Sequence, residues 1–549
     1  MPGRAANSVI SRSTAAGYAG ARRTGSAGLG PFLGMHHATP SGALPSARVT
    51  RPLRESILWQ AALVLGVALA VHLPLLGSSG LADSEGFRAI PAWEMLRSGD
   101  WGITTLFGQP YLRKPPGITW AIAASSAIFG ETEFAARFVS ALAATGAALA
   151  LFLFATRRWG PPFGLWAGLA YTLTPWFWRW GRSAEIESLH NALVLVTVLV
   201  VVHVATRARR AFMPDVVWAL VLGASLGGAL LVKGPAGLAC TAGAALGACV
   251  ATRSARPLSR WPLWVGLALG LAVFGAWFAP AASRAAALPD GAVVQSPSEF
   301  LWGAGKVARV LTLGPVTLLG ALPFALALPL ALCGPRHRDP LQREGDDAGR
   351  TLAWATLIAL GIETVVGVSN NRYAMPAVTW MPAVYAFALC RHRAGASEWA
   401  ARAGRAVLLG RPRLVAGLML LVAWGHLAWF EHRRDSRTSG LAAGLSLGAV
   451  LPPGDVWADR AIDTRPEVLW YAAREAERRG HDVRVRWIPG LASRPDAPRG
   501  TLVLLESQDN RPEDPPEIPE PRRSELGLGP PIWSGAAHVF RMIAVRRPE

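Results

Sequence analysis

Apolar runs of about 20 residues recur along the chain until about residue 430, and they restrict its fold more than any other feature. A run of this length can cross roughly 30 Å of hydrocarbon as one α-helix. Hydrophobic residues make up 51% of the 549-residue chain, a composition too apolar for a soluble protein. We therefore expect a polytopic α-helical membrane protein with about 11–13 transmembrane helices. Eleven of these spans lie near residues 56–76, 136–156, 162–178, 189–206, 214–231, 235–250, 262–280, 310–332, 351–368, 374–390 and 413–430.

The basic residues are distributed among the loops as membrane orientation requires. The formal net charge is +19, but the arginines sit in short loops rather than on one basic face with interleaved aromatics, so no nucleic-acid partner is expected. If Arg51 and Arg54 are cytoplasmic, the basic loops fall on that same side; these are 157–158, 207–210, 253–260, 336–350 and 391–413. The unusual polar residues then gather on the opposite face, in 82–116, 179–188, 233–235, 282–308 and 369–373 and after residue 431.

The chain divides by composition into three predicted parts. Residues 1–50 are rich in Ala, Ser, Gly and Arg and are expected to be a disordered tail. Residues 51–432 form the membrane domain, and 433–549 form a small soluble α/β domain on the outer side. Within the membrane domain, the apolar segment Ile118 to Phe129 is too short for a span and is expected to be a re-entrant or interfacial helix.

The first outer loop, Ala82 to Pro116, has the pattern of an interfacial helix. Phe87, Ile90, Trp93 and Leu96 recur every three residues and make an apolar stripe that suits the membrane surface, with a kink or restart at Pro91. Just before this stripe come Asp83 and Glu85. Either carboxylate could take a proton from an acceptor hydroxyl at the membrane edge. Alternatively, Asp83 or Ser84 could cap the helix.

Cations and acids in four later segments fall on the same predicted face. Arg113 and Lys114 precede two prolines that fix an extended backbone, which suits a phosphate site, although ordinary snorkelling to headgroups would explain them as well. A buried lysine between apolar runs, such as Lys233, needs an anionic partner. The other candidates are Arg182, Glu185, Glu187, Arg372 and Tyr373. Glu185 has a structural alternative as a partner of the helix dipole.

Several of these stretches resemble one known family. "SEGFRAIPAWEMLRSGDW" and "PYLRKPPGITWAIAASSAIFGETEFAARFVSAL" are similar to the first outer loop of GT-C membrane glycosyltransferases, in the branch of the lipid A aminoarabinose transferase and the protein O-mannosyltransferases. "LVKGPAGL" and "RYAMPAVTWMP" resemble later landmarks of that branch, in the same order. The resemblance covers most of the membrane part, whereas the C-terminal domain matches no family that we can name.

The resemblance implies a GT-C fold and transfer of a hexosyl or pentosyl group from a polyprenyl-phosphate donor to a lipid, glycan or protein acceptor. It places the reaction at the outer, periplasmic face of the bacterial inner membrane. It also implies a carboxylate in the first loop that activates the acceptor or positions it. Our hypothesis is an inverting single displacement in which Asp83 or Glu85 takes the acceptor proton. The substrate-binding residues would be Arg88, Tyr111, Arg113, Lys114, Arg182, Glu185, Glu187, Lys233, Arg372 and Tyr373.

Two departures from the family pattern leave points open. The adjacent Asp-Glu of the family is spread over Asp83-Ser84-Glu85, so either acid could hold the role. Arg113 stands where the lipid A branch often has an acid that helps to bind a metal, so no cofactor is indicated firmly and a divalent metal stays open. The alternatives to glycosyl transfer are a polytopic transporter, for which no repeats or midplane charges are evident, and a catalytically inactive glycolipid-binding relative.

Overall fold

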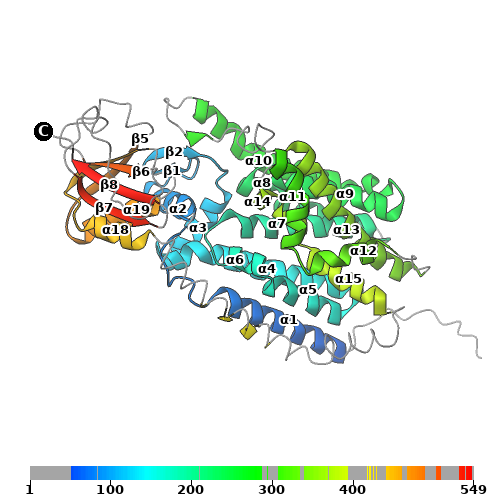
Figure 1. The fold of residues 1–549 in the computed structure, drawn as a ribbon. Helices are drawn as coiled ribbons and strands as arrows, with labels where there is room; N and C mark the ends of the chain where they lie inside the picture. The colour runs from blue at the N-terminus through cyan, green and yellow to red at the C-terminus, as the bar shows by residue number, and fades with distance from the viewer. Residues whose placement is uncertain are drawn as a thin grey trace, which may run out of the picture. The chain divides into compact units, whose positions relative to one another are not determined.

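The computed structural model is a mostly helical chain with a separate small sheet (Figure 1). It describes residues 51–82, 84–208, 211–286, 293–294, 307–333, 339–368, 370–393, 440–459, 466–488, 502–507, 531–537 and 540–546, with six single positions between 417 and 428. Residues 52–549 cluster as one compact unit, so the predicted boundary at residue 433 stays a prediction. The predicted tail 1–50 lies outside the described residues.

Seven described helices or helix pairs are long and apolar enough to cross a membrane. They are Glu55–His72 in α1 (Arg51–His72), α4 (Glu133–Trp159), α7 (Ile186–Thr206), α8 (Phe212–Lys233), Trp261–Arg284 in α10 (Trp261–Ala286), Gln342–Val366 in α13 (Pro340–Val366) and Asn371–Arg391, which joins α14 (Asn371–Ala374), the 3-10 turn Met375–Val378 and α15 (Met381–Arg393). The polytopic helical architecture is therefore confirmed.

Four other predicted spans take different forms. The span near 162–178 is two short helices, α5 (Pro161–Leu173) and α6 (Pro175–Gly181), because Thr174 adopts the extended conformation favoured before a proline. The span near 310–332 is α11 (Val307–Gly320) followed, after a bend of 100°, by a 3-10 turn (Phe324–Leu326) and α12 (Ala327–Leu332). The span near 235–250 is α9 (Ala236–Thr252), with 17 residues. Most of the span near 413–430 lies outside the described residues.

Small residues let the central helices approach closely. Where α8 crosses α10, Gly223 and Gly227 face Gly266 and Gly270, and a Cβ atom on Gly223 would lie only 2.7 Å from the Leu269 Cβ. Where α9 crosses α13, a Cβ atom on Gly243 would lie 2.8 Å from the Ala355 carbonyl. Such small-residue contacts replace the hydrophobic effect, which cannot drive helix association in lipid. Lys233 is the last residue of α8, and two residues separate it from the first residue of α9.

The first outer loop folds as helix, hairpin and helix. It contains α2 (Gly86–Ser98), β1 (Thr105–Leu106), β2 (Gln109–Leu112) and α3 (Gly117–Phe129), which is the predicted short helix. β2 pairs in parallel with β3 (Val293–Val294), which follows α10. α2 runs through Pro91 without a break, and its predicted stripe is buried. However, α2 does not lie open on a membrane surface, because α3 and α19 (Pro466–Arg478) cover it, and nearly every residue from 86 to 93 is buried.

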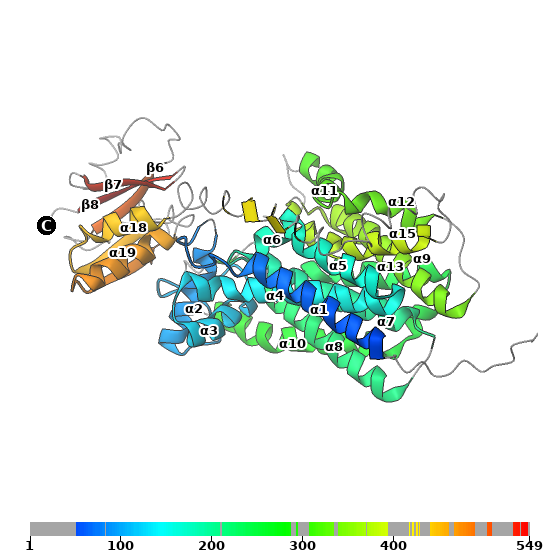
Figure 2. The same ribbon diagram turned by 90° about the horizontal axis from the view of Figure 1, so that it is seen from below.

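The predicted α/β character of the C-terminal part takes the form of a five-stranded mixed sheet. Its strands are β4 (Gly454–Asp459), β5 (Val483–Ile488), β6 (Leu502–Ser507), β7 (Pro531–Ala537) and β8 (Phe540–Arg546), in the spatial order β5-β4-β6-β8-β7. β4 is parallel to β5 and β6, and β8 is antiparallel to both of its neighbours. α18 (Leu441–Gly448) and α19 pack together on one face of this sheet (Figure 2).

Candidate functional site

Six charged side chains from five segments of the chain converge at one end of the helix bundle. We call this group the ionic cluster; it consists of Arg88, Lys114, Glu185, Glu187, Lys233 and Arg372. Sequence reasoning selected all six, from α2, the link between β2 and α3, the start of α7, the end of α8, and α14. Among these six described residues, four are basic and two are acidic.

The two acids lie at the N-terminus of α7. Glu185 is the residue before the helix, and its carboxylate makes no capping hydrogen bond, so the cap alternative receives no support from a direct contact. Instead, Glu185 accepts a hydrogen bond of 2.5 Å from the Ser84 hydroxyl and lies 3.4 Å from the Arg372 guanidinium. Glu187 contacts Arg372 at 3.1 Å and the Lys233 Nζ at 3.4 Å. Both acids are almost fully buried, so they need these cations as partners.

Lys233 and Arg372 are held by the backbone as well as by the acids. Lys233 ends α8, where a cation is favoured by the helix dipole. The next residue, Gly234, has φ +68° and ψ −149°, a conformation that favours glycine, and it turns the chain into Pro235 and α9. The Lys233 Nζ donates to the Arg372 carbonyl at 2.9 Å. The Arg372 guanidinium lies over the Trp180 ring, 4.4 Å from its centroid.

Tyr373 links the two lysines of the cluster. The Lys114 Nζ donates to the Tyr373 hydroxyl at 2.7 Å, and the Lys233 Nζ lies 4.4 Å from the centre of the Tyr373 ring. The pKa of Lys114 is lowered to about 7, mainly because the side chain is buried and to a smaller extent because Arg88 and Lys233 repel its charge. An added anion beside these cations would relieve that repulsion. The cluster is therefore suited to bind a group with negative charge, such as a phosphate.

Arg88 and Tyr111 stand at the edge of the cluster. The Arg88 side chain is buried and donates to the Phe87 carbonyl at 3.2 Å. Tyr111 stacks on the Phe87 ring with a centroid distance of 5.8 Å, and its amide donates to the Thr104 carbonyl. Tyr111 thus packs between α2 and the hairpin. Arg113, also predicted to bind substrate, is partly buried on the link that carries Lys114.

Glu85 occupies a different and closed environment. Its two carboxylate oxygens accept from the Arg137 guanidinium at 2.8 and 3.0 Å, and also from the amides of Ala82 and Ala184. Both side chains of the pair are about 1% exposed. Arg137 also donates to the carbonyls of residues 76, 79 and 80. Glu85 thus ties the first outer loop to α4 and to the segment before α7.

The remaining predicted residues are Asp83 and Arg182. Asp83 lies outside the described residues. Arg182 is fully buried and donates to three carbonyls at the end of α1, those of Val71, His72 and Pro74. Carbonyls at the end of a helix lack hydrogen-bond donors within the helix. Arg182 supplies donors to those of α1 and does not join the ionic cluster. Its predicted substrate-binding role receives no support from this position.

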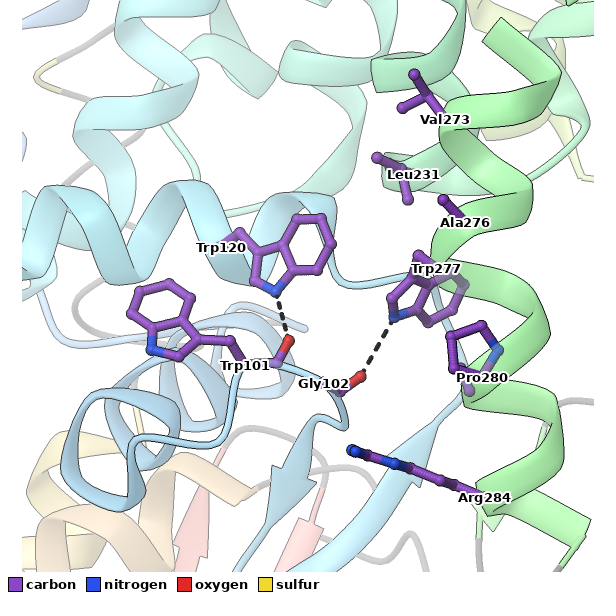
Figure 3. Close-up of a pocket in the computed structure, with 10 residues that line it drawn as sticks. Trp101, Gly102, Trp120, Leu231, Val273, Ala276, Trp277, Pro280 and Arg284 are labelled. Atoms are coloured by element: carbon purple, nitrogen blue, oxygen red, sulfur yellow. Dashed lines mark hydrogen bonds between the residues drawn. The ribbon is translucent and has the colours of Figure 1, made fainter. Parts of the chain in front are cut away.

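A pocket of about 460 Å³ lies between the first outer loop and α10, and Leu231 of α8, two residues before Lys233, also lines it (Figure 3). Trp101, Trp120 and Trp277 line it together with Arg284, whose guanidinium lies at its outer end. The Trp120 and Trp277 indoles donate to the carbonyls of Trp101 and Gly102, at 2.9 and 3.3 Å, so the two rings are held in place. Aromatic faces with one cation suit a sugar ring or a lipid chain that bears an anionic group.

Several residues of the site were not selected from the sequence. Ser84 and Trp180 were passed over, and nothing local marks a serine or a tryptophan as the neighbour of a distant carboxylate. Arg137 carried a usable signal, because an arginine inside an apolar helix needs a buried partner. Glu94 holds the β1–β2 hairpin by accepting from the Thr105 hydroxyl and the Phe107 amide, each at 2.6 Å.

A metal site would need oxygen, nitrogen or sulfur ligands in a group. In the part of the chain that the structure describes, no three His, Cys, Asp or Glu side chains lie close enough to hold an ion together. Arg113 and Lys114 occupy the place before the two prolines, and both repel a cation.

Comparison with known proteins finds similarity to membrane glycosyltransferases. Residues 113–278 match the family described as dolichyl-phosphate-mannose-protein mannosyltransferase. The undecaprenyl phosphate-alpha-4-amino-4-deoxy-L-arabinose arabinosyl transferase 1 of Sodalis glossinidius is 29% identical over 277 residues, which are 50% of this chain and 40% of that protein. The corresponding enzyme of Pseudomonas savastanoi pv. phaseolicola is 33% identical over 189 residues, 32% of each chain. The matched segments thus span less than half the length of these relatives.

Among solved structures, ArnT from Cupriavidus metallidurans bound to undecaprenyl phosphate has a TM-score of 0.62 at 18% identity, covering 88% of this chain and 97% of that one. This likeness shows the fold. The chain is a multi-pass membrane protein with the GT-C fold, and the resemblance to the branch of aminoarabinose and mannosyl transferases is confirmed.

Proposed function

We propose that this GT-C protein transfers a sugar from a polyprenyl-phosphate donor to a hydroxyl-bearing lipid, glycan or protein acceptor. The observation that carries the proposal is the convergence of four basic side chains, from segments far apart in the sequence, in one largely buried site. Cations gathered in this way suit the negative charge of a phosphodiester. The names of the relatives, which specify undecaprenyl phosphate and an aminoarabinose, support the same donor class.

The reaction is an inverting single displacement. A carboxylate takes the proton of the acceptor hydroxyl while the acceptor oxygen forms a bond to the anomeric carbon of the donor sugar. The bond between that carbon and the phosphate oxygen breaks, and its electron pair leaves with the polyprenyl phosphate. The phosphate gains one negative charge in this step. Lys233, Arg372 and Lys114 would stabilise that charge most in the transition state, where it develops.

For the base, the surroundings of Glu85 favour Asp83. The Glu85 carboxylate accepts from Arg137 and from two amides, which leaves it poorly placed to receive a proton from a substrate. Asp83 is two residues earlier, and its neighbour Ser84 donates to Glu185 of the cluster. We therefore assign the base to Asp83 and a structural role to Glu85.

The proposal also covers the sugar, the side of the membrane and the acceptor. The relatives' names make 4-amino-4-deoxy-L-arabinose, a pentose, the first sugar to test, ahead of a hexose. The alternation of basic loops supports placing the cluster on the periplasmic side of the bacterial inner membrane. The acceptor is selected by surfaces beside the cluster, among which the tryptophan-lined pocket is the most suitable.

The test uses purified protein with undecaprenyl-phosphate aminoarabinose and a membrane lipid extract as the source of acceptor. Transfer by the wild type, its loss in Asp83→Asn, and a folded Asp83→Asn protein that still binds the donor would support the proposal. Full activity of Asp83→Asn would remove the assigned base. A wild type that binds donor but transfers no sugar from any polyprenyl-phosphate donor tested would favour the glycolipid-binding alternative.

A further inference from the structure

The C-terminal domain contacts the first outer loop on both sides of its acidic residues. We use the name acidic turn for the described residues Leu81, Ala82, Ser84 and Glu85. The Leu81 amide donates to the Tyr471 hydroxyl of α19 at 2.7 Å, and the Tyr471 hydroxyl donates to the Glu133 carboxylate at 2.8 Å. Tyr471 is 6% exposed, so water does not replace these bonds readily.

The same helix also covers α2, which follows the acidic turn. Trp470 packs against Trp93 with a centroid distance of 4.8 Å. The Arg97 guanidinium lies over the Trp470 ring, 4.9 Å from its centroid. A Cβ atom on Gly86 would lie 2.9 Å from the Glu467 carboxylate, so α19 and the start of α2 are in close contact. α19 therefore restrains the loop before and after the acidic turn.

The acidic turn has three further attachments, which belong to the membrane part. Glu85 binds Arg137 of α4 and accepts from the Ala184 amide, and the Ser84 hydroxyl donates to Glu185 of the ionic cluster. Within the turn, the Ala82 amide donates to the Glu85 carboxylate, and the Glu85 amide donates to the Ala82 carbonyl. The membrane helices thus hold the end of the turn, and Tyr471 of the C-terminal domain binds its first residue, next to the carbonyls of residues 79 and 80 that Arg137 holds.

From these contacts we infer that Tyr471 is a positioning residue for the transfer reaction, through which the C-terminal domain sets the place of the acidic turn beside the ionic cluster. The inference rests on the proposed function, because it assumes that an acid of this turn acts in catalysis. Tyr471 touches no substrate. Its hydroxyl acts through the Leu81 backbone, and a misplaced base lowers the rate of the chemical step far more than it alters donor binding.

The test is Tyr471→Phe, which removes only the hydroxyl. We expect kcat to fall about tenfold with the donor KM within about twofold of wild type. Hydrogen exchange of the peptide that contains Leu81 should be faster than in wild type, because its amide has lost its acceptor. The matched control is Tyr385→Phe, since Tyr385 packs against Phe324 in the membrane part, and we expect it to leave both kcat and exchange unchanged.

Two results would overturn the inference. One is a Tyr471→Phe protein with wild-type kcat, and the other is a fall that appears only in KM. If this variant does not fold, Glu133→Ala provides the second test, because it removes the group that orients the Tyr471 hydroxyl, and kcat should fall about threefold. An unchanged kcat there would count against the inference. Absence of transfer in the wild type would instead defeat the proposed function, so the two failures are distinguishable.

Discussion

The Glu85–Arg137 pair and the ionic cluster differ in how closely the protein encloses their charges. In the pair, one guanidinium and one carboxylate bind each other through two hydrogen bonds, backbone groups complete their contacts, and both side chains are about 1% exposed. In the cluster, four cations lie around two acids, several contacts are as long as 3.4 Å, and the Arg372 side chain is 35% exposed. A ligand has little access to the enclosed pair, whereas it can reach the partly exposed side of the cluster.

The difference separates residues that hold the loop from residues that can act on a substrate. Position along the sequence does not separate them, because Glu85 and Arg88 are only three residues apart. What separates them is how closely the surrounding protein encloses each charged group. Ionisable side chains that gather in a partly open site are candidates for ligand binding.

The largest effect should come from breaking the matched pair. Arg137→Met leaves the Glu85 carboxylate buried beside an apolar side chain, so the free energy of unfolding should fall by about 3–5 kcal/mol. Thermal unfolding in detergent, followed by size-exclusion chromatography, measures this. The double variant Glu85→Gln/Arg137→Met should recover much of the loss. Equal stability of the single variant and wild type would show that the pair does not hold the loop.

The next effect should be a loss of activity without a loss of fold. Lys233→Met keeps an apolar stem but removes a cation of the cluster, and Arg372 remains beside Glu187. We expect kcat for transfer to fall about 100-fold, because one stabilising contact to the developing phosphate charge is lost. The melting temperature should stay near that of wild type. A variant that unfolds as readily as Arg137→Met would mean that Lys233 is structural.

A smaller effect should appear in the pH dependence of donor binding. Since the pKa of Lys114 is lowered to about 7, the side chain loses its proton as the pH rises through that value. The donor KM should therefore rise above about pH 7, by at most about tenfold per pH unit. Lys114→Arg should give a flatter profile, because a guanidinium stays charged. Parallel profiles for the two proteins would exclude Lys114 from phosphate binding.

The smallest effect concerns Glu94, which is partly buried and accepts hydrogen bonds from the Thr105 hydroxyl and from the Phe107 and Gly108 amides of the hairpin. Burial raises the pKa of Glu94 above its usual 4.5, so the folded protein holds this proton to higher pH than the unfolded chain does. The free energy of unfolding of wild type, relative to Glu94→Gln, should therefore fall by about 1 kcal/mol or less as the pH rises above 4.5. Chemical denaturation of both proteins between pH 4 and 7 measures the difference. If the free energy of unfolding of wild type, relative to Glu94→Gln, rose with pH instead, burial would not be the main influence on the Glu94 carboxyl.

Much of the site was accessible from the sequence because the alternation of basic loops and apolar runs fixes which loops share a face. This alternation predicts that Lys114, Glu185, Lys233 and Arg372 lie on the same face of the membrane. It could not distinguish Glu85 from the cluster, because the partner of Glu85 is an arginine 52 residues later inside an apolar helix. Pairing across such a distance depends on how α2 and α4 pack, and short-range patterns do not determine this.

The fold was predicted less well where helix length matters. A continuous apolar run from 162 to 178 indicates one span, but the Thr174-Pro175 step ends one helix and starts another. The docking of α19 on α2 was also not predicted, because a tyrosine and a tryptophan on an amphipathic helix equally fit an ordinary domain core. The partners of Tyr471 lie more than 300 residues earlier in the chain.

The pairing of β2 with β3 connects the lipid environment to the site. Among the seven described spans, the one in α10 has the smallest buried share, 17%, so within the described residues it is the span least covered by protein. β3 follows α10 in the chain and is bonded to the strand that runs directly into Arg113 and Lys114. A change in the tilt of α10, such as bilayer thickness can impose, would therefore act on the strand that leads into those two cations.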